Sequence, residues 1–547
     1  MDPHAEGGPP KAEVAEVDVE IGLKERLAVP PPVLSPLLAS SIFRNAREPG
    51  WDKPVEETDP EKVRAFQQEE FERQLRGEYE AAQQRVGEVV HGNMDRPMRL
   101  TSIRLAPPPP TTRTGFLDHL LSPFLGPSRL PSWLHPTPPP PTTLHEILLT
   151  TKALVQHVDQ LNVFDMERVR IRLEPSPSGE PNEVELVLGL REKGRVFLKA
   201  GTEFGANEGG GNVTARLRNA LGGGESLEFN ASLGTKTKSA YQASLTAPVF
   251  SSPYLSFCLS AFSVDRDNTA FASHRELQQG ARVQLSAISP WGVHDVQYEY
   301  VQRDISHLAP RASASVRALA NPTTKSSISH TWTSDTRDDP YLGTTGRLFK
   351  ATHEYAGLPG SSERAHFLKS TTQSHAGRQL YPGSDLFVSV SSFTSLLYPL
   401  WARTGATSDG APASTYLSDR TYLGGPNSVR GWKVGGLGLT DRMDSLGGDL
   451  AYAVGASLFA PVPSKEHWPL KIHTFINAGK VVRYDVDNSF ADNIAKMYSN
   501  PSLSVGVGLM YRFDPLRVEL NFSMPLIARR GERLARGLSI GVGVDFL

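Results

Sequence analysis

The feature that most constrains this chain is a two-residue alternation of apolar and polar side chains near its C-terminus. It runs through residues 503–513, 516–524 and 538–546, where one face carries mainly Leu, Val, Ile, Met, Tyr and Phe. The opposite faces carry mostly Ser, Gly, Asn, Asp, Glu and Arg. Because successive side chains of an extended strand point to opposite sides, this period predicts β-strands with one apolar and one polar face.

Similar alternating segments, separated by Gly, Pro, Asn, Asp and Ser, recur from about residue 195 to the C-terminus. A soluble β-sandwich also alternates, but its strands are usually shorter. Strands of about nine to eleven residues, tilted near 45°, match the thickness of a bilayer. At roughly 22 residues per strand and connection, this region provides close to 16 strands. Because lipid cannot satisfy the polar groups of open strand edges, we expect an all-β transmembrane barrel of about 16 antiparallel strands.

The composition argues against several other classes of protein. The 57 Lys and Arg residues are balanced by 59 Asp and Glu residues, so the net charge of −2 gives no general attraction to nucleic acid. A single cysteine, Cys258, excludes a disulfide scaffold and a cysteine-based zinc site. Residues 239–264 carry no charge, but Pro248 and Pro253 would interrupt a membrane-spanning helix. Walker A and H-E-x-x-H sequences are absent, so no enzymatic activity, cofactor or metal is expected.

The sequence predicts four regions. Residues 1–57 form an acidic, Pro-rich extension that is expected to be disordered, and residues 58–95 a helix. Residues 96–193 combine alternating and helical segments in the order strand, helix, helix, strand, strand. Residues 194–547 form the barrel, with a loop at about 397–446 inserted between two strands. The N-terminus has neither the pattern of a secretory signal nor that of an Arg-rich transit peptide.

The inserted loop contains a distinctive run, in which the Gly424-Gly425 turn is followed by Val429-Arg430-Gly431-Trp432. This run resembles the signature of the BamA-type outer-membrane β-barrel insertase superfamily. With the later Asn477-Ala478-Gly479, it is most similar to the mitochondrial branch, the central barrel subunit of the sorting and assembly machinery (SAM complex). The resemblance covers about residues 96–547 and implies one POTRA domain at 96–193, followed by a 16-stranded barrel.

The resemblance also implies a location and partners. The barrel would lie in the mitochondrial outer membrane, with its POTRA domain and N-terminus toward the intermembrane space. The implied partners are unfolded β-barrel precursor proteins, other SAM complex subunits and outer-membrane lipid, and not nucleic acid.

In this superfamily the loop folds back into the barrel lumen, so the resemblance gives its motif residues a common place. These residues are Gly424, Gly425, Val429, Arg430, Gly431 and Trp432. A buried arginine needs a carboxylate or carbonyl partner, because an unpaired buried charge is costly. Glu519 and Asp545 face the lumen by alternation and are candidates, as is Asn477, which stands where bacterial relatives have Asp.

The barrel must close between a first strand at about 195–206 and a last strand near 534–547. Glycines on these strands lack packing side chains, so the seam between them is expected to be weak, although barrel curvature explains them equally well. The glycines are Gly201, Gly205, Gly541 and Gly543. The last strand also resembles the C-terminal β-signal of substrates of this machinery, at Ser539, Gly541, Val544 and Phe546.

The implied function is the insertion and assembly of β-barrel precursors. The seam would open laterally, and the β-signal of the substrate would pair with the first strand by β-augmentation. The alternatives are a passive channel or porin with the loop as a plug, or a related protein translocase such as one of the plastid envelope. A barrel lipase would need a Ser, His and acid constellation, which the spacing does not provide.

Overall fold

A computed structural model gives the fold of the chain. It describes residue 88 and residues 90–126, 141–180, 182–205, 208–305, 307–339, 343–381, 383–400, 415–463, 468–513 and 516–543. The chain separates into two compact units, Met1–Gly92 and Asn93–Leu547. In the first unit, residues 88 and 90–92 are helical, whereas the expected extension over 1–57 and most of the expected helix over 58–95 lie outside the described residues.

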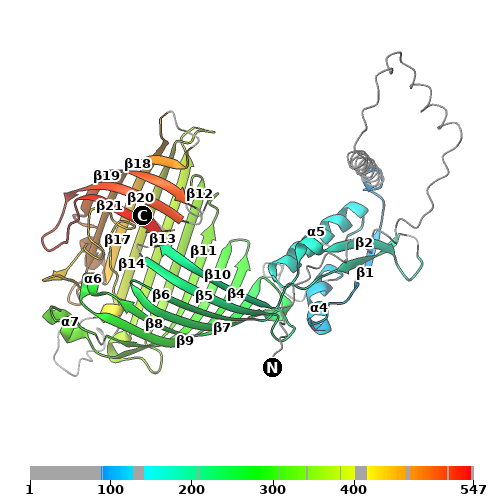
Figure 1. The fold of residues 1–547 in the computed structure, drawn as a ribbon, viewed down its shortest axis with the longest axis horizontal. Coiled ribbons are helices and arrows are strands. Elements are labelled where there is room, and N and C mark those ends of the chain that lie inside the picture. Colours follow the sequence, from blue (N-terminus) through cyan, green and yellow to red (C-terminus); the bar gives the residue numbers. More distant parts are fainter. Residues whose placement is uncertain are drawn as a thin grey trace, which may run out of the picture. The chain divides into compact units, whose positions relative to one another are not determined.

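The second unit begins with a small three-stranded sheet covered by two helices, which we call the α/β sheet (Figure 1). Its elements are β1 (Arg99–Leu105), α4 (Thr114–Leu121), α5 (Leu144–Gln160), β2 (Arg170–Pro175) and β3 (Glu183–Gly189), with short 3-10 turns at Ser122–Phe124 and Met166–Arg168. The strand order is β1-β3-β2, in which β3 is parallel to β1 and antiparallel to β2. The elements follow the order strand, helix, helix, strand, strand.

The core of this α/β sheet forms where the helices cover one sheet face. Leu120 of α4 and Ile147 and Leu154 of α5 are buried with Leu186 and Leu188 of β3. Helix α5 begins where the side chain of Thr143 accepts a hydrogen bond from a backbone N–H of the first turn, as N-cap residues do.

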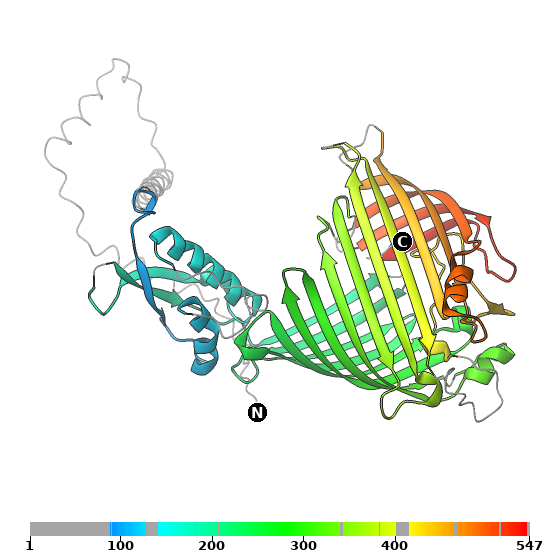
Figure 2. The same cartoon turned by 180° about the vertical axis from the view of Figure 1, so that it is seen from behind.

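The rest of the second unit is a 16-stranded sheet in which every strand is antiparallel to its neighbours (Figure 2). The first eight strands are β4 (Val196–Gly205), β5 (Glu208–Arg218), β6 (Ser226–Gly234), β7 (Thr237–Pro248), β8 (Leu255–Asp267), β9 (Arg275–Ser289), β10 (Gly292–Asp304) and β11 (Thr323–Asp335). The others are β12 (Gly346–Ala356), β13 (Phe367–Gln379), β14 (Phe387–Pro399), β17 (Leu450–Pro461), β18 (Leu470–Val482), β19 (Ser502–Phe513), β20 (Leu516–Ile527) and β21 (Gly537–Gly543). This sheet confirms the predicted barrel of 16 strands.

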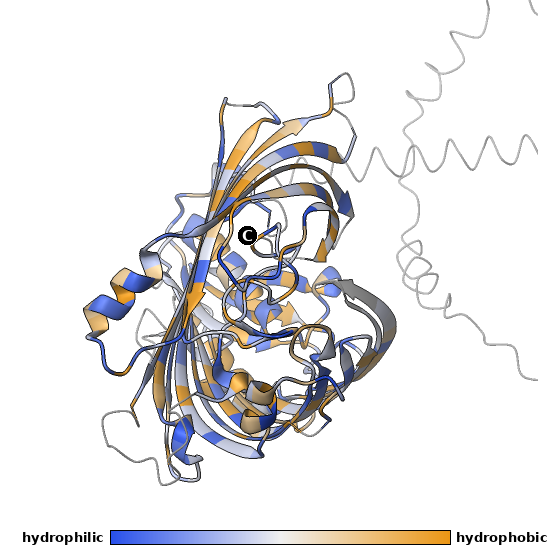
Figure 3. Cartoon of the chain, turned by 90° about the vertical axis from the view of Figure 1, so that its left-hand side faces the viewer, coloured by the Kyte–Doolittle hydropathy of each residue, from blue (hydrophilic) through white to orange (hydrophobic). Residues whose placement is uncertain are grey.

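Burial along the strands is the reverse of that in a soluble sheet. Apolar side chains such as Val507, Phe522 and Leu538 are 51%, 56% and 70% exposed, whereas Glu519 and Asn521 are fully buried. Hydrophobic and hydrophilic residues accordingly alternate along the strands (Figure 3). An apolar outer face around a polar interior is the arrangement that a bilayer requires of a barrel. None of the described helices is long and apolar enough to span a membrane.

Strand β20 is longer than the alternation predicted, because it continues through Pro525 to Ile527. Proline cannot donate to a ladder and is tolerated in a strand at bulges. The register between β19 and β20 shifts between Leu503 and Ser504, and Pro525 pairs with Ser504 at this irregularity.

The two ends of the barrel carry different connections. We call the end at which β4 begins the proximal end and the opposite one the distal end. Since neighbouring strands are antiparallel, the distal end holds α6 (Thr269–Ala272), α7 (Ala314–Leu319), α8 (Phe490–Tyr498) and the loop between β14 and β17. This loop, predicted at about 397–446, therefore enters the barrel from the distal end.

The barrel's first and last strands, β4 and β21, are the two ends of the hydrogen-bonded strand order. Their Cα atoms approach within 8 Å. Among the described residues of the two strands, however, no β-ladder joins them. The seam therefore leaves backbone groups of both edges outside the barrel ladder.

Candidate functional site

The described part of the inserted loop, residues 415–449, packs against the inner wall of the barrel (Figure 3). It contains a 3-10 turn at Leu417–Asp419 and two short strands, β15 (Thr440–Asp441) and β16 (Asp444–Ser445). Val429 and Trp432 are buried with Ala451 and Ala453 of β17 and Val481 of β18. Apolar packing therefore fixes the motif of the loop beside the strands that follow it.

Arg430 is fully buried and forms an ion pair with Glu519 of β20. Its Nη2 and Nε donate to Oε2 of Glu519 at 2.9 and 3.3 Å, and its Nη1 donates to Oδ1 of Asn477 of β18 at 3.4 Å. The backbone carbonyl of Arg430 accepts a hydrogen bond of 2.5 Å from the hydroxyl of Ser504 of β19. One loop residue thus contacts three consecutive strands of the wall.

Glu519 is shared by two arginines, because Arg517 on the same strand also pairs with it. Aromatic rings also contact both arginines. The guanidinium of Arg430 lies 4.7 Å from the ring centre of Phe475, and the guanidinium of Arg517 lies 5.1 Å from the ring centre of Phe459. Such faces carry negative potential and stabilise cations. Asn521 also donates to Oε2 of Glu519 at 2.8 Å, so the buried carboxylate is held by several donors.

The loop also pairs with the connection between β20 and β21. Lys433 N donates to Arg533 O at 3.0 Å, and Ala535 N donates to Gly431 O at 2.9 Å. The indole Nε1 of Trp432 donates to Glu532 at 3.0 Å. The motif is therefore tied to the distal end of the last hairpin as well as to the wall.

Gly431 is required by its backbone conformation and its surroundings. Its φ is +96°, and a Cβ at this position would lie 3.2 Å from Cβ of Ser504 and 3.3 Å from Cγ of Pro525. A side chain would be both strained and crowded at the point where the chain turns between Arg430 and Trp432.

A second anchor holds the start of the loop. Arg303 of β10 donates to both carboxylate oxygens of Asp419, at 2.5 and 3.2 Å, and each side chain is only 3% exposed. Lys369 of β13 donates to the Asp419 carbonyl at 2.8 Å. Burial raises the pKa of the Asp419 carboxyl, but the charges of Arg303, Lys325 and Lys369 outweigh burial and hold this pKa below its usual value.

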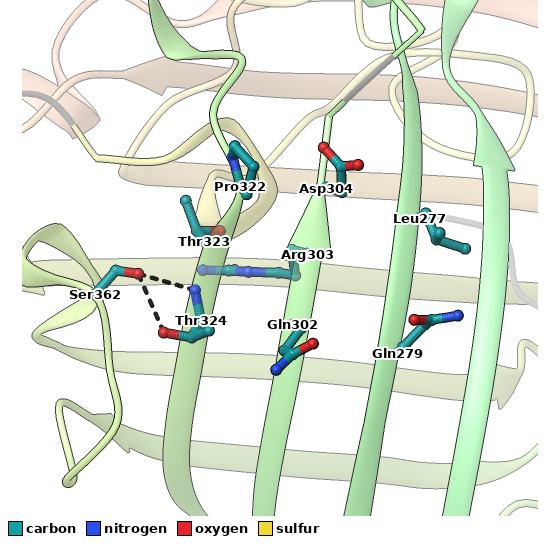
Figure 4. A pocket seen from close by; sticks show the side chains of 9 residues that line it. All are labelled: Leu277, Gln279, Gln302, Arg303, Asp304, Pro322, Thr323, Thr324 and Ser362. Carbon is teal, nitrogen blue, oxygen red and sulfur yellow. Dashed lines mark hydrogen bonds between the residues drawn. The ribbon is translucent and has the colours of Figure 1, made fainter.

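Figure 4 shows the side of β10 from which Arg303 projects. It lies beside a small hollow at the distal ends of β9, β10 and β11, where Ser362 bonds the backbone and hydroxyl of Thr324 at 2.9 and 3.2 Å. These polar groups satisfy one another, whereas the charge of Arg303 is neutralised by the loop.

The two anchors lie on opposite walls of the barrel. Seven strands lie between β10 and β20 along the continuous ladder, so β20 is the eighth strand from β10, halfway around the 16-stranded order. The loop therefore crosses the lumen and joins walls that have no direct ladder between them. In the described part of the chain, no group of His, Cys, Asp and Glu is arranged to hold a metal ion.

The structure brings together many, but not all, of the residues that the sequence singled out. Of the three candidate partners of Arg430, Glu519 and Asn477 contact it, and Asp545 lies outside the described residues, as do Val544 and Phe546. Gly201 and Gly205 lie on β4, and Ser539, Gly541 and Gly543 on β21. Gly541 and Gly543 pair with Glu519 and Arg517, beside the loop anchor.

Sequence reasoning missed several residues that complete the site: Arg303, Asp419, Arg517, Asn521 and Glu532. Arg517 and Asn521 share the alternation face of Glu519, so the strand pattern could have placed them. Asp419 lies shortly before the Gly424-Gly425 turn of the loop, but its partner is 116 positions away in the chain and carries no local signal.

Comparisons with known proteins agree with this fold. The Omp85 superfamily domain matches residues 219–546. A SAM50-like protein of Schizosaccharomyces pombe is 31% identical over 84% of this chain and 94% of its own length. The human sorting and assembly machinery component 50 homolog is 28% identical over 74% of this chain and 84% of its own length. The crystal structure of BamA from Haemophilus ducreyi lacking POTRA domains 1–3 aligns with a TM-score of 0.62 at 15% identity, covering 81% of this chain and 84% of that one.

The chain therefore belongs to the Omp85 superfamily of outer-membrane β-barrel proteins. Within it, the similarity to curated relatives makes the chain a SAM50-like member.

Proposed function

We propose that this protein inserts and assembles β-barrel precursor proteins in the mitochondrial outer membrane. The observation that carries the proposal is the pair of adjacent edges, β4 and β21, beside a loop anchored in the lumen. The names of the relatives, sorting and assembly machinery component 50, support the same role. Residues 96–193 would be a POTRA domain that faces the intermembrane space and meets precursors before the barrel does.

The physical driving force would be backbone hydrogen bonding. In lipid, each unsatisfied N–H or C=O group costs several kcal/mol, so an opened edge of β4 would strongly favour an incoming strand. The C-terminal β-signal of a precursor would pair with β4, and later strands would extend the new sheet. No covalent step, cofactor or nucleotide is needed.

The loop would hold the last strand, β21, in its position at the seam. Asn427 Nδ2 donates to the carbonyl of Val542 on β21 at 2.9 Å, so the anchored loop also contacts the last strand. Arg430 would hold the loop in this position through Glu519. We expect Arg430→Ala to remain inserted in the membrane but to fail in maturing substrate barrels, while Arg216→Ala, which removes a partly exposed ion pair with Glu228, assembles substrates normally. Normal assembly by Arg430→Ala would contradict the proposed role of the loop.

The direct test of the mechanism is disulfide capture in isolated mitochondria. Thr202→Cys on β4 is placed in a Cys258→Ser background, and a cysteine series is placed in the C-terminal strand of a radiolabelled precursor. The matched control is Val296→Cys, an outward-facing position on β10 in the middle of the wall. Register-dependent crosslinks at Thr202 alone would support insertion at the seam. Equal crosslinking at both positions, or none while the barrel conducts ions, would favour the passive channel instead.

A further inference from the structure

A basic hollow lies where the α/β sheet leads into the first strand of the barrel. It is lined by the loop at Ala106–Pro110, by β2 and by the segment that leads into the barrel. Six cations line it, namely Arg168, Arg170, Arg172, Arg191, Lys193 and Arg195, against the two acids Glu167 and Glu192. All five arginines are exposed.

The cations of the basic hollow are not neutralised by strong partners. Arg168 lies 3.5 Å from Asp165 and Arg172 lies 3.9 Å from Glu174, and both arginine side chains are more than half exposed, so these pairs are weak. Glu192, by contrast, is engaged elsewhere, because its carboxylate accepts hydrogen bonds of 2.6 Å from the hydroxyls of Thr111 and Thr112. The hollow therefore keeps a net positive charge.

The chain runs directly from the basic hollow into the first strand of the barrel. Lys193 N donates to Val163 O within the α/β sheet, and Arg195 O accepts from Arg218 N of β5, so Gly194 alone separates the two sets of backbone bonds. The next residue, Val196, begins β4 and is 79% exposed on the apolar outer face. Consecutive Cα atoms are about 3.8 Å apart, so Arg195 lies at the border of the lipid-facing surface.

Neighbouring bonds hold this border in place. The guanidinium of Arg195 donates to the carbonyls of Asn219 and Ala220 at 3.2 and 3.1 Å, in the proximal connection between β5 and β6. Asn219 in turn donates to the hydroxyl of Thr112 at 2.9 Å. The basic hollow is thus tied to the proximal rim of the barrel rather than carried on a free linker.

We propose that the basic hollow binds the phosphate headgroup of an anionic phospholipid of the membrane in which the barrel lies. Arginine suits this ligand, because its planar fork donates two hydrogen bonds to one phosphate. Cations beside a membrane surface also gain from the negative potential of anionic lipid. The occupant is a lipid because the border of the lipid-facing surface adjoins the hollow. The inference requires the barrel to lie in a membrane but does not require the insertase function.

The test uses the full chain in a neutral detergent, with phosphatidylglycerol and phosphatidylcholine added in equal amounts and retention measured by native mass spectrometry. The test variant is Arg168→Gln/Arg170→Gln/Arg172→Gln. The matched control, Arg96→Gln/Arg99→Gln/Lys152→Gln, removes three exposed cations of the same α/β region that lie outside the hollow.

We expect the wild-type chain and the control to retain phosphatidylglycerol in preference to phosphatidylcholine. Each arginine near a membrane surface is worth about a fivefold change in binding, so the test variant should lose at least about tenfold even with partial screening. Replacing the same arginines by lysine should restore most of the preference, which separates charge from a folding defect. Equal retention by the test variant and the control would overturn the proposal. So would displacement of the lipid by an equal concentration of inorganic phosphate, or binding of an acidic peptide without phosphatidylglycerol.

Discussion

The ion pair between Arg303 and Asp419 gives a quantitative test of how the inserted loop is held. The perturbation is a double-mutant cycle of Arg303→Met, Asp419→Asn and the combined variant. Methionine keeps most of the volume of the arginine stem without charge, and asparagine keeps the shape of aspartate. The full chain would be refolded into lipid vesicles, because its apolar outer face needs lipid.

The surroundings of the pair predict unequal single effects. Around the pair lie the cations Lys325 and Lys369 and the anions Glu276 and Glu354. Loss of Arg303 leaves the buried Asp419 carboxylate without its bidentate partner, whereas Asp419→Asn still leaves Arg303 near the carboxylates of Glu276 and Glu354. Arg303→Met should therefore cost about 3–5 kcal/mol, as expected when one partner of a buried pair is removed. Asp419→Asn should cost about 1.5–3 kcal/mol, because the amide oxygen still accepts one hydrogen bond.

The assay is guanidinium unfolding followed by tryptophan fluorescence and by gel mobility of the unheated protein. The combined variant should lose less stability than the sum of the single variants, with a coupling energy of roughly 1.5–3 kcal/mol. Arg216→Met serves as the control, since its pair with Glu228 is 31% and 23% exposed and should be worth less than about 1 kcal/mol. Additive single effects, or a larger loss for Asp419→Asn than for Arg303→Met, would refute the reasoning.

Three further predictions concern the loop itself. Gly431→Ala should cost about 1–3 kcal/mol because φ is +96° and the new Cβ would meet Ser504, and the loop should become cleavable by added protease while strand protection persists. Asn427→Ala removes the bond to the carbonyl of Val542, so amide exchange in β21 should rise about fivefold for a loss near 1 kcal/mol, and unchanged exchange would count against that contact. Because the folded pKa of Asp419 is lowered, its stabilising effect is present above the usual carboxyl pKa and is lost as pH falls through the lowered value. Stability measured against pH should show a larger loss in acid for the wild type than for Asp419→Asn.

Much of the barrel could be predicted from the alternation of its strands. The segments 503–513 and 516–524 correspond to β19 at Ser502–Phe513 and β20 at Leu516–Ile527. The end of β20 could not be predicted, since Pro525 argues against a strand unless the register irregularity beside it, at Leu526, is known. Local alternation reports which face a side chain occupies but not the register irregularities that long-range pairing creates.

The site was predictable to the extent that a local pattern encodes it. The loop motif and alternation together placed Arg430 and Glu519 in the lumen, and the structure shows them in contact. The pairing of Trp432 with Glu532, 100 positions away, depends on how the last hairpin folds over the loop. No periodicity carries such information, because it arises from the closed sheet as a whole.

The crossing of the lumen by the inserted loop has a mechanical consequence. The loop connects its two anchors, on β10 and β20, across the lumen and so divides the barrel wall into two parts. One part, from β10 to β20, is a continuous β-ladder that the loop anchors hold at both ends. The other part contains the seam between β4 and β21. Its β8–β9 connection also contacts the loop, because the ring of Phe271 packs edge-on against the ring of Tyr422 with 5.3 Å between ring centres. If the seam opens, the strands from β10 to β20 should keep their curvature. Strands β4 to β7 should move outward together, with the hinge near β8.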